Sequence, residues 1–320
     1  MTMPISHLQS GKERRKNITL VSACDENYFP LVKGLYLSMI ESGALTNNVD
    51  LAFLNIGCHH NSIDWLVNNG IAVLELNRNV MGGLADQKYG YRRGQICRAF
   101  LPEFLPSASL ISWMDPDMWV QDMVGFLSIL DSAANHESQI YISQEVHQGF
   151  VWPGFTYKDR IDGEASIFSY IYDDGIGHDL SQYPTYNSGF FAMDRSNQIW
   201  SSWKREIQRI YIDDYDRLKN GRNFHFGDQA SLNYILKDVS GISLIDPLYN
   251  YMCMWNPPVR SNDGIVRTTL NPQLPIGVLH LGGGWKRRGG IYLEKNLLYN
   301  SGNYLTQADK ECLASQSIPR

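Results

Sequence analysis

Two carboxylates separated by a single residue are the strongest chemical signal in the chain. Asp115 and Asp117 flank Pro116 and directly follow the apolar run 110–114, which predicts a buried strand. Pro116 restricts the turn, so less freedom is lost when both carboxylates bind one ion. Hard divalent cations such as Mg²⁺ or Mn²⁺ prefer oxygen ligands and bridge readily to a diphosphate. The motif indicates a metal site, with a simple acidic turn as the alternative.

A histidine far along the chain is a candidate third metal ligand. His280 closes the apolar run 276–279 and precedes Gly282-Gly283-Gly284-Trp285-Lys286. Such glycines, Gly283 among them, let the backbone approach a phosphate closely, and Lys286 could neutralise its charge. Neutral imidazole is also an acceptable ligand for Mn²⁺. A lone histidine at a strand end is more often a structural residue than a metal ligand. Here the adjoining glycines favour the metal-ligand interpretation.

Two further segments carry side chains that suit the hydroxyls of a sugar. Asn187 and Ser188 lie in the first, and Asp228 and Gln229 lie in the second. Each has a local alternative. Asn-Ser-Gly is a good turn sequence, and Asp228 is a good helix N-cap.

The elements that must position these residues alternate between strands and helices. Apolar runs predict strands at 18–23, 49–56, 71–76 and 110–114, and helical spacing predicts helices from about 30, around 63–67 and from about 95 to 104. This alternation predicts an α/β fold with a mostly parallel sheet covered by helices. Asp25 and Asp115 would then lie at the carboxyl ends of strands, where ligands collect in open sheets.

The second half of the chain is less regular. Residues 145–185 are rich in Gly, Tyr, Asp and Pro, which predicts long loops with a small helical insertion. A strand is predicted at 188–193, a helix capped by Ser196, and a shorter helix that starts near Asp228.

Composition bounds the class of protein. The chain has 320 residues, 43% hydrophobic and 19% charged, which is typical of a globular protein. A net charge of -5 does not favour nucleic acid as a partner. No apolar run approaches the roughly 20 residues of a membrane span. We expect a flexible basic leader at 1–16, one domain at 17–297 and a polar tail at 298–320.

The basic leader and the cysteines indicate where in the cell the protein is expected to be. The leader is expected to be solvated, with peripheral contact to an anionic membrane as the alternative. Five scattered cysteines without a Cys-x-x-Cys pair favour free thiols and a cytoplasmic protein.

Taken in order, the motifs resemble the family 8 glycosyltransferases, the galactosyltransferase and glycogenin type with a GT-A fold. The resemblance spans residues 18–286, and its pieces are Ser22-Ala23-Cys24-Asp25-Glu26-Asn27-Tyr28, Arg98-Ala99-Phe100-Leu101-Pro102, Asp115-Pro116-Asp117, Asn187-Ser188-Gly189, Asp228-Gln229 and His280 with Lys286. The chain departs from the family at Ala230, at Arg287 and Arg288, and at Trp113-Met114, which marks it as a divergent member. The donor sugar and the acceptor are left open by these departures.

The resemblance implies a retaining transfer of a sugar from a UDP-sugar to a glycan or protein-linked acceptor. We expect the irregular region 145–185 to lie on the acceptor side. Nucleotide contacts would come from Ser22, Ala23, Cys24, Asp25, Asn27 and Tyr28. Arg98 would brace the donor sugar and its phosphates, with Gly283 and Lys286 at the diphosphate. Mn²⁺, or Mg²⁺, would be bound by Asp115, Asp117 and His280. The candidate catalytic residues, which line the sugar subsite, would be Asn187, Asp228 and Gln229, with Glu145 as a further sugar contact.

Two other classes of function compete with a transferase. A nucleotidyltransferase also binds metal through acids on an α/β sheet, but its first strand is usually followed by a glycine-rich basic loop. Here the acidic segment Cys24-Asp25-Glu26-Asn27 occupies that place. A carbohydrate-binding protein on a transferase scaffold would have no need to retain Asp115, Asp117, His280 and Lys286 together.

Overall fold

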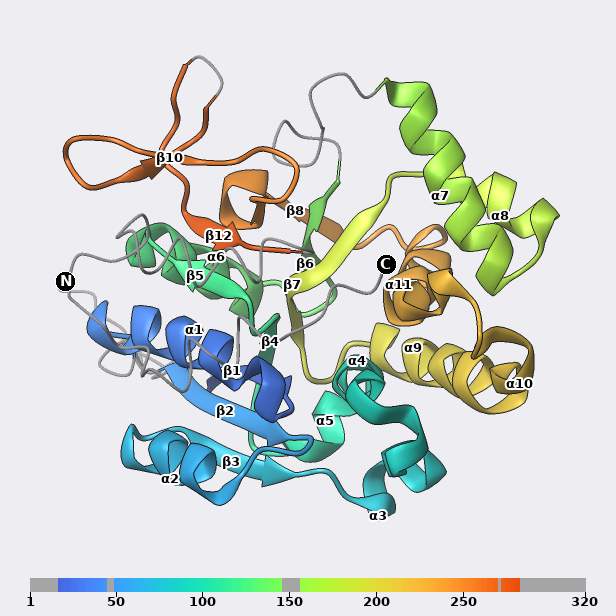
Figure 1. Ribbon diagram of the computed structural model, residues 1–320, viewed down its shortest axis with the longest axis horizontal. Coiled ribbons are helices and arrows are strands. Elements are labelled where there is room, and N and C mark those ends of the chain that lie inside the picture. The colour runs from blue at the N-terminus through green and yellow to red at the C-terminus, as the bar shows by residue number, and fades with distance from the viewer. Residues whose placement is uncertain (1–16, 45–48, 146–155, 270–271, 283–320) are drawn as a thin grey trace, which may run out of the picture.

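The computed structural model describes residues 17–44, 49–145, 156–269 and 272–282 (Figure 1). Its centre is a seven-stranded sheet in the order β3-β2-β1-β4-β7-β6-β8. The pairs β1–β2, β2–β3, β1–β4 and β6–β8 are parallel, and β7 runs antiparallel to both β4 and β6. The expectation of a mostly parallel α/β sheet is confirmed. The strands are β1 (Ile18–Cys24), β2 (Val49–Asn55), β3 (Ala72–Glu75), β4 (Leu110–Met114), β6 (Ile140–Gln144), β7 (Tyr186–Asp194) and β8 (Ile242–Ile245).

Helices cover both faces of the sheet because neighbouring residues of each central strand point to opposite sides. Leu20 packs in one buried cluster with α1 (Phe29–Glu41), α2 (His60–Asn68) and α6 (Met123–Ala134). Val21 packs in the other, with α7 (Tyr157–Ile171), α8 (Asp174–Ser181), α9 (Ile199–Gln208) and α11 (Gly227–Leu236). The central strands are therefore buried on both faces, which explains their continuous apolar runs.

A second, separate sheet has three strands in the order β5-β12-β9, and the short turn from β4 to β5 joins it to the main sheet. Its strands are β5 (Met118–Val120), β12 (Val278–His280) and β9 (Tyr251–Met252). Trp119, Tyr251 and Leu279 are buried in a small cluster of their own around it. A separate two-stranded ribbon is formed by β10 (Val259–Arg260) and β11 (Val266–Arg267).

Local predictions were corrected at three places. The helix expected at about 95–104 is broken into α4 (Arg93–Ile96), a 3₁₀ turn (Cys97–Phe100) and α5 (Leu101–Phe104), which has Pro102 in its first turn. Ser196 does not cap α9, whose N-cap is Gln198, because Ser196 Oγ donates to Asp194 instead. The described residues 156–185 are more helical than expected, since α7 and α8 form a packed pair at the opposite end of the molecule from α2 (Figure 1), while the rest of the predicted loop region, 146–155, lies outside the described residues.

The remaining helices are short. They are α3 (Arg78–Met81) and α10 (Tyr215–Leu218), with 3₁₀ segments at Glu26–Tyr28, Gly82–Ala85, Gln87–Arg92, Arg222–Phe226 and Pro247–Tyr249 and a π-turn at Arg209–Asp213. Within the described part of the chain, no helix is long and apolar enough to span a membrane.

Candidate metal centre and sugar site

Strand pairing brings the three predicted metal ligands together. Asp115 follows β4, and Asp117 immediately precedes β5. In the second sheet His280 of β12 pairs with Met118, which places the histidine beside Asp117. The site therefore lies where the main sheet passes into the second sheet, at the carboxyl end of β4.

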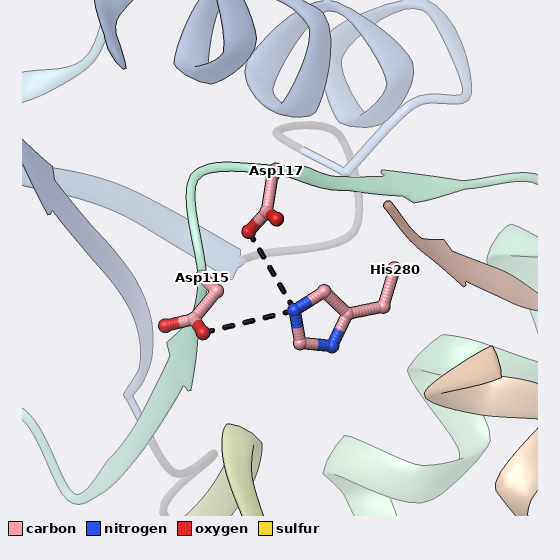
Figure 2. Close-up of side chains that lie close together, drawn as sticks. All are labelled: Asp115, Asp117 and His280. Carbon is pink, nitrogen blue, oxygen red and sulfur yellow. Dashed lines mark ion pairs between the residues drawn. The ribbon is translucent and has the colours of Figure 1, made fainter. Parts of the chain in front are cut away.

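The three side chains converge on one point (Figure 2). His280 Nε2 lies 3.8 Å from Asp115 Oδ2 and 3.6 Å from Asp117 Oδ1. One ligand atom from each residue lies within 4.8 Å of the others. The Asp117 and His280 side chains are 1% and 6% exposed, whereas the Asp115 side chain is 19% exposed.

Each ligand is oriented by a hydrogen bond on the side away from this point. Asp115 Oδ1 accepts from Arg98 and from Trp113 Nε1, which leaves Oδ2 toward His280. Asp117 Oδ2 accepts from the backbone N–H of Gly282 at 3.0 Å. Such partners fix the direction of a ligand before any ion binds.

The histidine is oriented by a residue that the sequence did not single out. His280 Nδ1 lies 2.8 Å from Asn250 Oδ1, and Asn250 Nδ2 donates to Asn187 Oδ1 at 3.0 Å. Because the Asn250 amide nitrogen is used on Asn187, its oxygen faces the ring and requires the proton on Nδ1. The Nε2 lone pair is then directed at the two carboxylates, as a metal ligand needs. Asn250 is fully buried before β9, and no sequence motif marks it.

The donor set fits a divalent cation. Two carboxylate oxygens and one imidazole nitrogen suit Mn²⁺ better than Mg²⁺, which prefers oxygen alone. Gly189 of β7 lies directly beside these ligands, and its carbonyl accepts a hydrogen bond from Asp115 N at 2.7 Å. A Cβ at Gly189 would lie 2.6 Å from His280 Cε1 and 3.1 Å from Asp115 Oδ2. The absence of a side chain at this position is a condition for the cluster to form.

Arg98 links the metal cluster to the sugar residues. Its guanidinium contacts Asp115 on one side, and on the other it donates to Asp228 Oδ2 at 2.7 Å and to Ser188 Oγ at 2.9 Å. Although burial acts to lower it, the carboxylates of Asp115 and Asp228 raise the pKa of Arg98. Burial raises the pKa of Asp228, and Arg98 opposes that shift. Asp228 does not cap α11, whose N-cap is Phe226, because its carboxylate is taken by Arg98.

The predicted sugar residues form one hydrogen-bonded cluster. Glu145 Oε1 accepts from Asn187 Nδ2 at 2.7 Å and from Gln229 Nε2 at 3.2 Å. Gln229 Oε1 in turn accepts from the backbone N–H of Ser188 at 3.2 Å. Asn187, Ser188 and Gly189 lie in β7 rather than in a turn, so the local alternative for this motif is wrong. The amide and carboxylate groups are held in place next to the metal ligands.

The residues predicted to hold the nucleotide lie at the end of β1. Ser22, Ala23 and Cys24 are buried within the strand, and Asp25 follows it as predicted. Burial raises the pKa of Asp25, while hydrogen bonds from the backbone of Tyr28 and Asn27 oppose the shift. Asp25 Oδ1 is buried and accepts no hydrogen bond from the described residues. Asn27 is exposed, Tyr28 is half-buried, and the predicted phosphate contacts Gly283 and Lys286 lie outside the described residues.

Comparison with known proteins identifies the class of fold. No protein-family model and no curated protein sequence matches the chain. The structure is similar to the galactosyltransferase LgtC in complex with donor and acceptor sugar analogs, with a TM-score of 0.55 and 16% identity over 92% of this chain and 100% of that chain. An active-site mutant of LgtC gives a TM-score of 0.51 and 16% identity over 82% of this chain and 86% of that one.

A third solved structure, the bifunctional glycosyltransferase WbbM, has a TM-score of 0.51 at 13% identity and covers 73% of this chain and 40% of WbbM. These likenesses define the class: the chain has the GT-A fold of glycosyltransferases. The resemblance found in the sequence is confirmed at the level of the fold, at an identity that marks a divergent chain.

Proposed function

We propose that this chain is a metal-dependent glycosyltransferase of the family 8 type, which moves a sugar from a UDP-sugar to an acceptor hydroxyl. The observation that carries the proposal is the convergence of Asp115, Asp117 and His280 at the carboxyl end of β4 in a GT-A fold. A bound Mn²⁺ or Mg²⁺ would supply positive charge for the diphosphate leaving group. A glycan or a protein-linked sugar is the proposed acceptor, and the cytoplasm is the proposed location.

Other residues of the chain are proposed to bind the uracil base and the diphosphate and to stabilise the charge that develops during transfer. Asp25, with an accepting oxygen at the end of β1, suits an N–H of the uracil base. Arg98 is held between Asp115 and Asp228, which places its positive charge between the metal ligands and the sugar residues. A preorganised charge of this kind stabilises a transition state without reorganising during the reaction. Lys286 and Gly283 are the proposed partners of the diphosphate.

The sugar cluster suits a transfer in which no protein nucleophile is activated. Asp228 is 2% exposed and paired with Arg98, so its carboxylate is not available to attack a sugar. Asn187, Gln229 and Glu145 offer amide and carboxylate groups that bind hydroxyls and stabilise positive charge on the reacting ring. Retention of configuration is part of the proposal, and it rests on the resemblance to the family.

Turnover of the donor tests the proposal. The protein is incubated with Mn²⁺ and a panel of UDP-sugars, and released UDP is measured with and without mixed glycan acceptors. We expect UDP release from one donor, lost with EDTA and reduced at least about a hundredfold in Asp117→Asn, as expected when a metal ligand is removed. Unchanged release in Asp117→Asn would refute the metal role. Binding of UDP-sugars without release under any condition would favour a non-catalytic binding protein.

A further inference from the structure

A cavity of about 110 Å³ lies beside the sugar cluster, at the end of the β6–β7 pair. It is lined by Gln144 and Thr185 on the sheet side and by residues of α7 and the end of α8 on the other. Glu145, the residue after Gln144, donates its backbone N–H to Thr185 O at 2.8 Å. The cavity therefore adjoins the backbone of Glu145, whose carboxylate accepts hydrogen bonds from Asn187 and Gln229 and acts electrostatically on Glu164 in the cavity wall.

On the α7 side, the cavity is lined by an arginine that has a buried N–H group without a hydrogen-bond acceptor. Arg160 Nη1 is buried and has no hydrogen-bond partner in the described part of the chain. Arg160 Nη2 lies 3.9 Å from Glu164 Oε1, which is too long for a hydrogen bond, although the two side chains are only 16% and 15% exposed. A buried donor without a partner is destabilising, so a ligand group that accepts from Arg160 would remove that penalty.

Glu164 supplies the complementary group. Burial raises the pKa of Glu164 to about 8, with a further contribution from Glu145, and Arg160 opposes the shift. Near neutral pH the carboxyl therefore both donates and accepts. Glu164 faces Arg160, and Glu145 adds negative charge near Glu164, so the charge of Arg160 is offset and the cavity does not favour an anion.

The rest of the lining matches a sugar. Amides come from Gln144 and Gln182, and the ring of Tyr183 beside them is 44% exposed. A sugar hydroxyl is both donor and acceptor, and the C–H face of a sugar packs well on an aromatic ring. An enclosed cavity of about 150 Å³ holds one benzene, so this smaller one takes the edge of a ring rather than a disaccharide.

We propose that this cavity binds the hydroxyl-bearing edge of a neutral acceptor sugar, with Arg160 and Glu164 as the contacts that select it. The inference rests on the proposed function and extends it, because Glu145 connects the cavity to the donor-sugar cluster through Asn187 and Gln229. The helical insertion α7–α8 thereby acquires a role in the choice of acceptor.

Saturation-transfer NMR on the full chain with UDP and Mg²⁺, which is diamagnetic and leaves the proton signals intact, tests this proposal. The probes are the methyl glycosides of galactose, glucose and mannose, with methyl glucuronide as the anionic comparison. We expect saturation of at least one neutral glycoside and no preference for the glucuronide. Arg160→Met and Tyr183→Ala should each weaken binding about fivefold, which corresponds to the loss of one hydrogen bond or a comparable contact. Lys158→Met is the matched control, because Lys158 lies on the same helix with 81% of its side chain exposed.

Three results would overturn the inference: no saturation of any neutral glycoside, equal binding in Arg160→Met, or tighter binding of the glucuronide. Thermal unfolding shows which variants are folded, and Tyr183→Ala removes a partly exposed ring and spares the core. Calorimetry of UDP with Mn²⁺ on the same samples separates the two proposals. Intact nucleotide binding with a failed glycoside result rejects only the acceptor cavity. If glycosides bind in a way that depends on Arg160 but no nucleotide binds, the sugar-binding cavity is supported and the proposed glycosyltransferase function is refuted.

Discussion

His280 donates a hydrogen bond from Nδ1 to the side-chain oxygen of Asn250 across 2.8 Å, in a fully buried setting. The bond fixes the ring tautomer and directs Nε2 at Asp115 and Asp117. Since Asn250 also donates to Asn187, the same residue ties the metal cluster to the sugar cluster.

Removing this partner should weaken the metal site. Asn250→Ala leaves Nδ1 without its acceptor, so the ring can change tautomer, and we expect Mn²⁺-dependent UDP affinity to fall about 10- to 100-fold. Asn250→Asp still accepts from Nδ1 and should retain more of the affinity than Asn250→Ala. Calorimetry of UDP with saturating Mn²⁺ measures both. Equal affinities in the parent and Asn250→Ala would show that the histidine needs no orientation.

A methyl group at Gly189 should disrupt the cluster. Its Cβ would lie 2.6 Å from His280 Cε1 and 2.8 Å from Asn187 Oδ1, so His280 or the strand must shift. We expect Gly189→Ala to lower the free energy of unfolding by about 1–3 kcal/mol and to weaken Mn²⁺-dependent UDP binding at least about tenfold. Gly163→Ala in α7, where a Cβ meets nothing within 4 Å, is the control. Similar behaviour of the two variants would contradict the packing argument.

The buried pair of Arg98 and Asp228 gives a prediction about stability. Arg98→Met leaves the Asp228 carboxylate, 2% exposed, without its counter-charge, and should cost about 3–5 kcal/mol in urea unfolding. The double variant Arg98→Met/Asp228→Asn removes the stranded charge and should regain part of that loss. Arg205→Met, at an exposed position of α9, should change little. A double variant no more stable than Arg98→Met would argue against a charge effect.

Glu164 should make stability depend on pH. Its pKa rises from its usual 4.5 to about 8 in the folded protein, so between these values the folded state binds the proton that the unfolded state has lost. The free energy of unfolding should therefore fall as pH rises from about 4.5 to 8, and then level off for this group. Glu164→Gln should be more stable than the parent at pH 8, by on the order of a few kcal/mol, and similar at pH 4.5.

Urea unfolding at several pH values between 4.5 and 8 measures the difference between Glu164→Gln and the parent. Glu103→Gln, at a side chain that is 38% exposed, is the control and should follow the parent. Parallel curves for the parent and Glu164→Gln would show that the carboxyl titrates normally.

The main sheet and the metal ligands were predictable because their signals are local. Long apolar runs marked β1, β2 and β4, and the acids directly after β1 and β4 had to lie at one edge of a parallel sheet. His280 was found from the adjoining glycines and the family resemblance, and the structure places it beside Asp117.

What the sequence missed depends on contacts between distant segments. Strands β5 and β9 have three and two residues, too few for any periodicity to be visible, yet they bring Asp117 and Asn250 to His280. Asp228 has the sequence signature of an N-cap, but the charge of Arg98, 130 residues away, determines its place. The cavity beside Glu145 likewise arises only when α7 packs near the end of the sheet.

Calorimetric titration of UDP in the presence and absence of Mn²⁺ tests the central claim most directly. GDP, ADP and CMP serve as nucleotide comparisons, and Asp213→Ala/Asp216→Ala, at two exposed acids, is matched to Asp115→Ala/Asp117→Ala. The account predicts tight UDP binding that requires Mn²⁺, persists in the exposed pair and disappears in Asp115→Ala/Asp117→Ala. UDP binding that is the same with and without Mn²⁺, or that survives the loss of both acids, would contradict it.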